Sequence, residues 1–120
     1  MASILVVEDD ADVAGLIRLR LSSSGHRVAV APDGEAGIAA ARAEVPDLVI
    51  LDWMMPRKSG IEVCAELRAD ERFTGTKIMM LTARAKDSDV ERAYTAGADD
   101  YVTKPFSARE LLSRVEKLVA

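Results

Sequence analysis

The sequence predicts an α/β fold in which helices cover both faces of a doubly wound parallel sheet. Five short aliphatic runs alternate with segments of helical spacing; the runs are Ile4–Val7, Val28–Val30, Leu48–Leu51, Ile78–Leu81 and Tyr101–Val102. Strands that alternate with helices are typical of parallel sheets, because each crossover helix returns the chain to the same end of the sheet. Right-handed crossovers then favour five strands in the order 2-1-3-4-5 with five helices.

Turn and capping residues delimit the helices. The segment after the first strand has one apolar helical face, which consists of Val13, Leu16, Ile17 and Leu21. Gly25 is a good stop signal for this first helix. The turn at Asp33 and Gly34 can cap the alanine-rich second helix, which ends near Glu44 because Pro46 cannot continue it. The three later helices each begin with a capping-box pattern, a serine followed three residues on by a glutamate: Ser59–Glu62, Ser88–Glu91 and Ser107–Glu110. Gly97 would end the fourth helix just before the fifth strand.

Several apolar positions are expected in the core. The fifth helix has the most regular apolar stripe, which consists of Leu111, Leu112, Val115, Leu118 and Val119. Cys64 has helical spacing to apolar neighbours, and Met79 and Met80 lie within a strand, so we expect all three to fill core space.

The composition is that of an ordinary soluble domain, which we place at residues 1–120. Hydrophobic residues make up 49% of the chain and charged residues 30%. A net charge of −4 argues against a nucleic-acid-binding surface. No apolar segment approaches the roughly 20 residues that cross a bilayer. We expect no signal peptide, because the first apolar run has no basic region before it and ends at Val7. The single cysteine rules out an internal disulfide and suits the reducing cytoplasm.

The third strand carries the strongest functional signal. Leu48–Leu51 is a run of large aliphatic residues, the pattern of a strand buried on both faces. It ends in Asp52, and Pro56 stops any regular continuation. Open α/β sheets bind ligands outside the carboxyl ends of such strands. We therefore expect Asp52 to face a crevice and to act as a nucleophile that accepts a phosphoryl group.

Polar side chains follow the other strands as well. Because parallel strands end at one edge of the sheet, these residues should meet Asp52 there: Glu8, Asp9 and Asp10 after the first strand, Thr82 after the fourth, and Thr103 and Lys104 after the fifth. Each has an ordinary alternative role, since strand-end acids often cap helices, threonines occur in turns and lysines are usually solvated. Asp10 directly precedes the first helix and is best explained as its cap.

Glu8 and Asp9 are harder to explain as caps. Adjacent acids beside Asp52 would repel one another unless a cation lay among them. Oxygen ligands on loops suit Mg²⁺ or Mn²⁺, and the absence of thiolates and imidazoles there disfavours zinc. With the cation offsetting charge, Lys104 adds a positive contact and Thr82 a hydrogen bond to a phosphoryl oxygen. The set therefore predicts phosphoryl chemistry.

Other titratable residues are expected away from this edge. Asp99 and Asp100 precede the fifth strand and, at about 3.3 Å per residue, should lie roughly 10–15 Å from its other end. Asp87 and Asp89 flank the start of the fourth helix and suit its positive end. His26 stands alone in a turn, where we expect it at the surface.

Together these residues form motifs that resemble a known family. The motifs are ILVVEDD at residues 4–10, LDWMMP at 51–56, LTA at 81–83 and GADDYVTKPF at 97–106. Over essentially its whole length the chain resembles a response-regulator receiver domain of two-component signalling, with transcription-factor receivers most similar. The resemblance implies a flavodoxin-like fold. It also implies a signalling domain rather than an enzyme, one that catalyses only its own phosphorylation and dephosphorylation.

The resemblance assigns roles to the acids at the strand ends. Asp52 matches the aspartate that takes a phosphoryl group from the phosphohistidine of a histidine kinase and becomes an acyl phosphate. Asp9 and Asp52 match the side-chain Mg²⁺ ligands. Glu8 is expected to act through a water molecule, and the backbone carbonyl of Met54 completes the protein's share of the ligands.

The resemblance also implies a switch and a set of partners. Thr82 and Lys104 match the pair that contacts the phosphoryl oxygens. Tyr101 matches an aromatic residue that turns inward when Thr82 moves towards the phosphate, and Pro105 matches a proline that follows a cis bond. The output surface would be the fourth helix, fifth strand and fifth helix. The implied partners are a sensor histidine kinase or phosphotransfer protein, an output domain or protein, and a second copy of the phosphorylated chain.

The charges for such a homodimer are only partly present. Asp100 and Arg114 supply one pair across the expected interface. Val90 stands where an arginine would be expected to meet Glu110, so this second pair is missing.

Three other interpretations share some of these features. An aspartyl phosphatase would carry a second acid two residues after its nucleophile, where this chain has Met54. A flavin-binding module would need a loop rich in Ser, Thr and Gly after the first strand, where this chain has acids. A receiver-like interaction module that is never phosphorylated would usually lack an acid, the hydroxyl or the lysine. This last interpretation is the alternative to phosphorylation.

Overall fold

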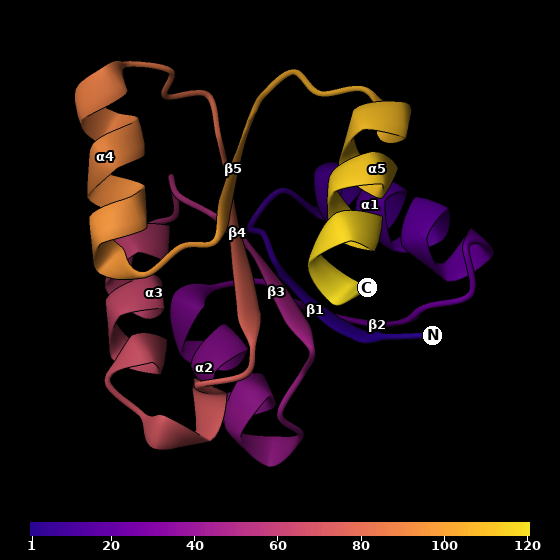
Figure 1. The fold of residues 1–120 in the computed structure, drawn as a ribbon, viewed down its shortest axis with the longest axis horizontal. Helices are drawn as coiled ribbons and strands as arrows, with labels where there is room; N and C mark the ends of the chain where they lie inside the picture. The colour runs from indigo at the N-terminus through magenta and orange to yellow at the C-terminus, as the bar shows by residue number, and fades with distance from the viewer.

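The computed structural model describes residues Met1–Ala120 and contains a five-stranded sheet in the predicted order, β2-β1-β3-β4-β5 (Figure 1). The strands are β1 (Ser3–Val7), β2 (Arg27–Ala31), β3 (Leu48–Asp52), β4 (Lys77–Thr82) and β5 (Asp100–Thr103). Every neighbouring pair is parallel. The predicted doubly wound α/β fold is therefore confirmed, and β1 and β3 are neighbours at the reversal point.

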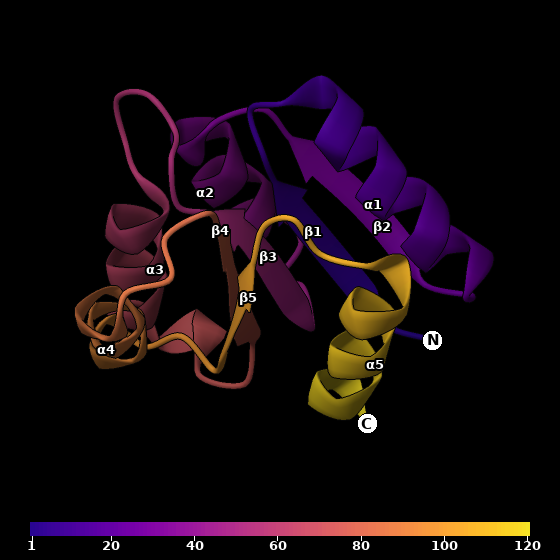
Figure 2. The ribbon, with the colours of Figure 1, turned by 90° about the horizontal axis from the view of Figure 1, so that it is seen from above.

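Helices cover the sheet on both sides. They are α1 (Ala11–Ser23), α2 (Gly34–Ala43), α3 (Gly60–Arg68), α4 (Asp87–Ala96) and α5 (Ala108–Val119), with a short 3₁₀ helix, η1 (Glu71–Phe73). Figure 1 and Figure 2 show α1 and α5 on one face and α2, α3 and α4 on the other. No helix is long and apolar enough to cross a membrane.

The pleat of β3 divides the core into two layers. Leu48 and Ile50 belong to the cluster that packs under α1 and α5, whereas Val49 and Leu51 belong to the cluster under α2, α3 and α4. All five residues of β3 are buried, which explains why its sequence is continuously apolar up to Asp52. The core positions predicted for Cys64, Met79 and Met80 are confirmed.

Most of the predicted caps are present. Asp10 and Asp33 cap α1 and α2 with their side chains, and Ser59 forms a complete capping box at α3. Ser107 forms half of a box, since its hydroxyl accepts the N–H of Glu110. Gly97 ends α4 in the left-handed conformation, with φ 113°.

The cap predicted at Ser88 is wrong. The helix α4 begins at Asp87, two residues earlier than a cap at Ser88 requires, and its N-cap residue Lys86 makes no side-chain capping bond. Ser88 thus lies inside the first turn. The acids Asp87 and Asp89 place negative charge at the positive end of the helix dipole, which stabilises this start without a capping hydroxyl.

The surface position predicted for His26 is also wrong. Its side chain is 5% exposed, its Nδ1 lies 3.1 Å from the N–H of Ala2, and its Nε2 lies 2.8 Å from a Glu116 oxygen. The turn at residue 26 packs between the start of β1 and the last turns of α5. A backbone N–H at Nδ1 requires the tautomer that carries its proton on Nε2.

Candidate functional site

The carboxyl ends of the strands bring the predicted residues to one edge of the sheet. Glu8 follows β1, Asp52 and Thr82 are the last residues of β3 and β4, and Lys104 follows β5. The register aligns these ends, because Asp52 lies opposite Leu81 and Thr82 opposite Thr103. Asp99 and Asp100 lie at the start of β5, at its other end.

Three carboxylates gather at this edge. Glu8, Asp9 and Asp52 each offer an oxygen within 4.8 Å of the others. Glu8 and Asp52 are buried and Asp9 is exposed. The Oε2 atom of Glu8 is buried without a hydrogen-bond partner. A set of hard oxygen donors with an unsatisfied buried oxygen fits a divalent cation such as Mg²⁺, so these residues can hold a metal ion.

Lys104 reaches into the acidic cluster. Its Nζ lies 2.8 Å from a Glu8 oxygen and 3.5 Å from a carboxylate oxygen of Asp52. The following peptide bond, to Pro105, is cis. Burial disfavours the charged ammonium, but the hydrogen bond to Glu8 and the charges of Asp52 and Glu8 outweigh it and raise the pKa of Lys104. The lysine is therefore firmly protonated.

Two of the acids, Asp52 and Asp9, have raised pKa values. Burial, together with a hydrogen bond to Glu8 and its charge, raises the pKa of Asp52 to about 6. Burial and then Asp52 raise the pKa of Asp9. One lysine does not offset the negative charge of three acids, so the cluster favours a further cation.

The backbone of the turn after β3 lies close to Asp52. The N–H of Met54 donates to a carboxylate oxygen of Asp52 at 3.2 Å. The N–H of Gly60 donates to the carbonyl of Trp53. A Cβ at Gly60 would lie 2.4 Å from the carbonyl oxygen of Asp52, so only glycine fits there. Sequence reasoning missed this role of Gly60, although its place directly after the capping serine marks a tight turn.

The predicted switch residues are linked through Arg84. The hydroxyl oxygen of Thr82 accepts the N–H of Arg84 at 3.1 Å, and the carbonyl of Arg84 accepts the hydroxyl of Tyr101. Tyr101 is buried and its ring meets Trp53 edge-on, with centroids 6.4 Å apart. The aromatic side chain thus points inward in this structure.

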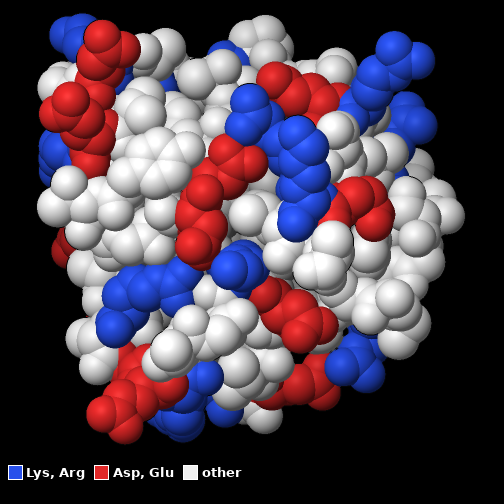
Figure 3. Space-filling model, viewed as in Figure 1, with Lys and Arg blue, Asp and Glu red and all other residues white.

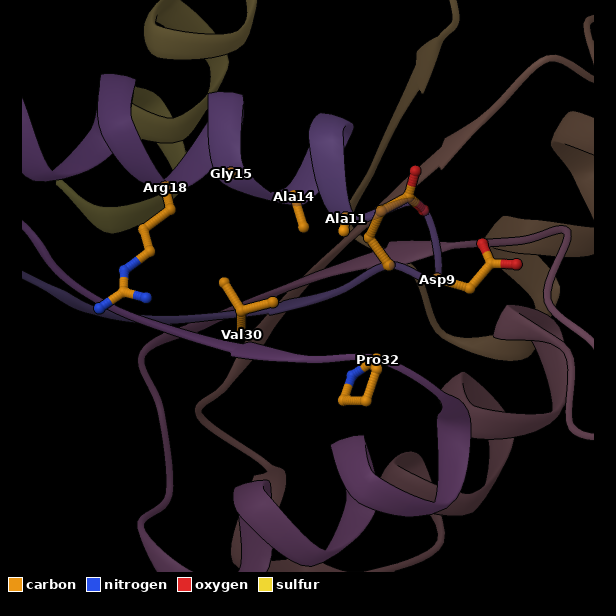
Figure 4. A pocket seen from close by; sticks show the side chains of 8 residues that line it. Asp9, Ala11, Ala14, Gly15, Arg18, Val30 and Pro32 are labelled. Carbon is orange, nitrogen blue, oxygen red and sulfur yellow. The ribbon is translucent and has the colours of Figure 1, made fainter.

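A cavity of about 240 Å³ lies beside the acidic cluster, between α1 and β2 (Figure 4). Its wall is largely apolar, and Arg18 and Asp9 stand at opposite ends of it in Figure 4. The lining residues are Glu8, Asp9, Ala11, Ala14, Gly15, Arg18, Val30 and Pro32. Asp52 does not line this cavity, so the space lies beside the acidic cluster rather than over Asp52.

Comparison with known proteins identifies the family. The response regulator receiver domain matches residues 4–116. The chain belongs to the response regulator receiver family. It is a receiver domain of two-component signalling, a signalling module rather than a classical enzyme, with acids that can bind a metal ion.

Individual relatives give the same result. The DNA-binding dual master transcriptional regulator RpaA of Synechocystis is 41% identical over 119 residues, which are 99% of this chain and 49% of that protein. The transcriptional regulatory protein PhoP of Bacillus subtilis is 43% identical over 116 residues, 97% of this chain and 48% of that protein. The chemotaxis protein CheY4 of Vibrio cholerae has the same fold, with a TM-score of 0.94, 28% identity and 98% of both chains covered. This receiver spans about half the length of the curated relatives it matches.

Proposed function

We propose that Asp52 accepts a phosphoryl group from the phosphohistidine of a sensor histidine kinase or phosphotransfer protein. A carboxylate oxygen of Asp52 attacks phosphorus while the P–N bond breaks. The electron pair of that bond passes to the imidazole nitrogen, which takes up a proton, and Asp52 becomes an acyl phosphate. The observation that carries this proposal is the buried Asp52 carboxylate, which lies 3.5 Å from the Lys104 ammonium and within 4.8 Å of two further acids.

The residues around Asp52 fit this transfer. Mg²⁺ or Mn²⁺, when bound by Glu8, Asp9, Asp52 and the backbone carbonyl of Met54, offsets the negative charge that the phosphoryl group brings. Lys104 supplies a second positive contact to the phosphoryl oxygens. These groups come from the ends of three strands, β1, β3 and β5, so the rigid sheet holds them in place.

Thr82, Tyr101 and Pro105 form the proposed switch. The Thr82 hydroxyl turns to donate a hydrogen bond to the phosphoryl group. Because it accepts the N–H of Arg84, whose carbonyl accepts the Tyr101 hydroxyl, a movement of Thr82 reaches Tyr101 through one residue. The surface of α4, β5 and α5 then changes and controls an output domain or protein in the cytoplasm.

A phosphorylation-dependent homodimer through this surface would require a rearrangement. Asp100 and Arg114, the pair expected between copies, bind each other within the chain at 2.7 Å. Acidic and basic side chains are interspersed over the face shown in Figure 3. A partner docking there would meet mixed charges rather than a single-sign field.

Intact mass after incubation with acetyl phosphate tests the proposed acceptor. We expect one phosphoryl adduct on the wild-type chain in the presence of Mg²⁺, and none after chelation. Asp52→Ala should form no adduct, whereas Asp12→Ala, which removes an exposed acid on α1, should behave like the wild type. Folded wild-type protein that never gains the adduct would contradict the proposal and favour an interaction module that works without phosphorylation.

A further inference from the structure

Two arginines lie against the residue that follows the acceptor. Trp53 is the only tryptophan in the chain and is 4% exposed. The guanidinium carbon of Arg84 lies 4.8 Å from the centre of its ring system, and that of Arg92 lies 5.4 Å away. Such cation–π contacts are favourable, and more so when they are partly desolvated. The acceptor turn is therefore attached to α4 through the indole.

The side chain of Arg84 also joins the acceptor turn to α4 directly. One of its terminal nitrogens lies 3.1 Å from Asp89 on α4, and the other lies 3.7 Å from the sulfur of Met54. Asp89 is 7% exposed, and Arg84 is its only ion-pair partner. Met54 in turn donates its N–H to Asp52. A single residue thus separates the Arg84 guanidinium from the acceptor carboxylate.

The hydrogen bonding of this guanidinium is incomplete. The Nε–H of Arg84 is buried and has no acceptor. A phosphoryl group on Asp52 would bring up to about two negative charges and three strong acceptor oxygens to the neighbouring position. Asp89 offers one negative charge. An arginine side chain can donate two parallel hydrogen bonds to a phosphoryl group. Phosphorylated Asp52 is therefore a better partner for the Arg84 guanidinium than Asp89 is.

We propose that Arg84 is a further phosphoryl-contacting residue of this receiver, one that leaves Trp53 and Asp89 for the phosphoryl group and so frees the first turn of α4. This inference rests on the proposed phosphorylation of Asp52. Arg92 lies on α4 itself and keeps its contact with the indole. The guanidinium of Arg84 thereby adds a side-chain route from the acceptor to α4, beside the backbone route that joins Thr82 to Tyr101.

The test uses beryllofluoride with Mg²⁺ as the phosphoryl mimic. Binding is followed by ¹⁹F NMR, and its effect is followed by Trp53 fluorescence and by the amide shifts of residues 87–96. We expect beryllofluoride to change the fluorescence of the wild type and of Arg92→Gln. Arg84→Gln should still bind beryllofluoride but lose this change and the α4 shifts. Asp89→Asn, which releases Arg84, should bind beryllofluoride at a lower concentration than the wild type.

The outcomes separate this inference from the function on which it rests. A fluorescence change and α4 shifts that persist in Arg84→Gln, or that Arg92→Gln loses equally, would overturn the role of Arg84. Wild-type protein that shows no bound beryllofluoride by ¹⁹F NMR would overturn the phosphorylation of Asp52 and this inference with it. If Arg84→Gln unfolds, Arg84→Lys keeps the charge without the paired donors and should retain only part of the change.

Discussion

At the scale of single residues, the Asp52 carboxylate is buried in surroundings that disfavour its charge. Burial and Glu8 raise the pKa of Asp52 from 3.8 to about 6. Between these values the folded chain binds more protons than the unfolded chain, so the free energy of unfolding should fall as the pH rises from about 4 to about 6. A cation bound beside Asp52 would favour the ionised form of this acid. The function proposed for Asp52 thus comes at the expense of stability.

Asp52→Asn should therefore stabilise the metal-free protein. In EDTA at about pH 7.5 we expect its free energy of unfolding to exceed that of the wild type by about 1–3 kcal/mol, and this difference should shrink at about pH 4.5. Urea unfolding at both pH values measures it. Asp12→Asn, on the exposed face of α1, should show no such pH-dependent gain. Equal stabilities of wild type and Asp52→Asn at both pH values would contradict the raised pKa.

Gly60 is a second residue at which the site constrains the sequence. A Cβ there would lie 2.4 Å from the Asp52 carbonyl and 2.8 Å from the Trp53 Cα, so the backbone of the acceptor turn must shift. We expect Gly60→Ala to destabilise the protein by about 1–3 kcal/mol and to lower its phosphoryl adduct yield.

Gly15→Ala provides the matched control for Gly60→Ala. Nothing lies within 4 Å of the added Cβ at position 15, which is in the interior of α1. This change should stabilise by about 0.5–1 kcal/mol. Thermal unfolding compares the two variants, and effects of the same sign would show that the close approach at Gly60 is not the cause.

At the scale of elements, the side chain of Arg68 connects three segments near the start of β5. Arg68, in the last turn of α3, donates to the carbonyls of Gly97 and Phe73 at 2.9 and 2.7 Å and binds Asp99 at 2.7 Å. It therefore joins α3, η1 and the connection from α4 to β5. Because α4 and β5 belong to the proposed output surface, this guanidinium helps to set the position from which that surface moves.

Arg68→Ala should loosen that connection. We expect a loss of about 2–4 kcal/mol in the free energy of unfolding, since the carbonyls of Gly97 and Phe73 and the carboxylate of Asp99 each lose a hydrogen bond to the guanidinium. Arg42→Ala removes an exposed ion pair between α2 and Glu66 on α3 and should cost less than about 1 kcal/mol. Hydrogen exchange at residues 97–100 localises the effect, and equal losses for both variants would contradict it.

At the scale of the whole molecule, what the sequence predicted follows from local pattern. Strand and helix order, the strand-end cluster and the caps at Asp10, Asp33 and Ser59 depend on periodicity and neighbouring residues. What it missed depends on pairs far apart in the chain. His26 and Glu116, for example, are 90 residues apart.

The start of α4 shows that sequence reasoning also missed a contact between residues close together in the chain. Asp89 was expected only to suit the helix end, but it is buried against Arg84 from the preceding loop, and the helix begins before Ser88. The topology brings such residues together only once the sheet has formed. Local capping rules cannot anticipate a pair that depends on how the loop packs.

His26 shows how the last helix is closed onto the first strand. Its ring accepts the N–H of Ala2 and donates to Glu116, so it joins the α1–β2 turn to the start of β1 and the end of α5. His26→Phe would leave the Ala2 N–H without its acceptor and Glu116 without its donor, and should cost about 1–3 kcal/mol. Hydrogen exchange should rise at residues 2–4 and 113–119 together.

Glu116→Gln is the matched control for His26→Phe, because its amide oxygen still accepts from the histidine. It should leave the exchange of residues 2–4 unchanged. If His26→Phe raised exchange in α5 alone, the histidine would serve only as a surface partner of Glu116. If exchange rises in both segments, the first strand and the last helix open as one unit. A movement of α5 on phosphorylation of Asp52 would then also disturb the start of β1.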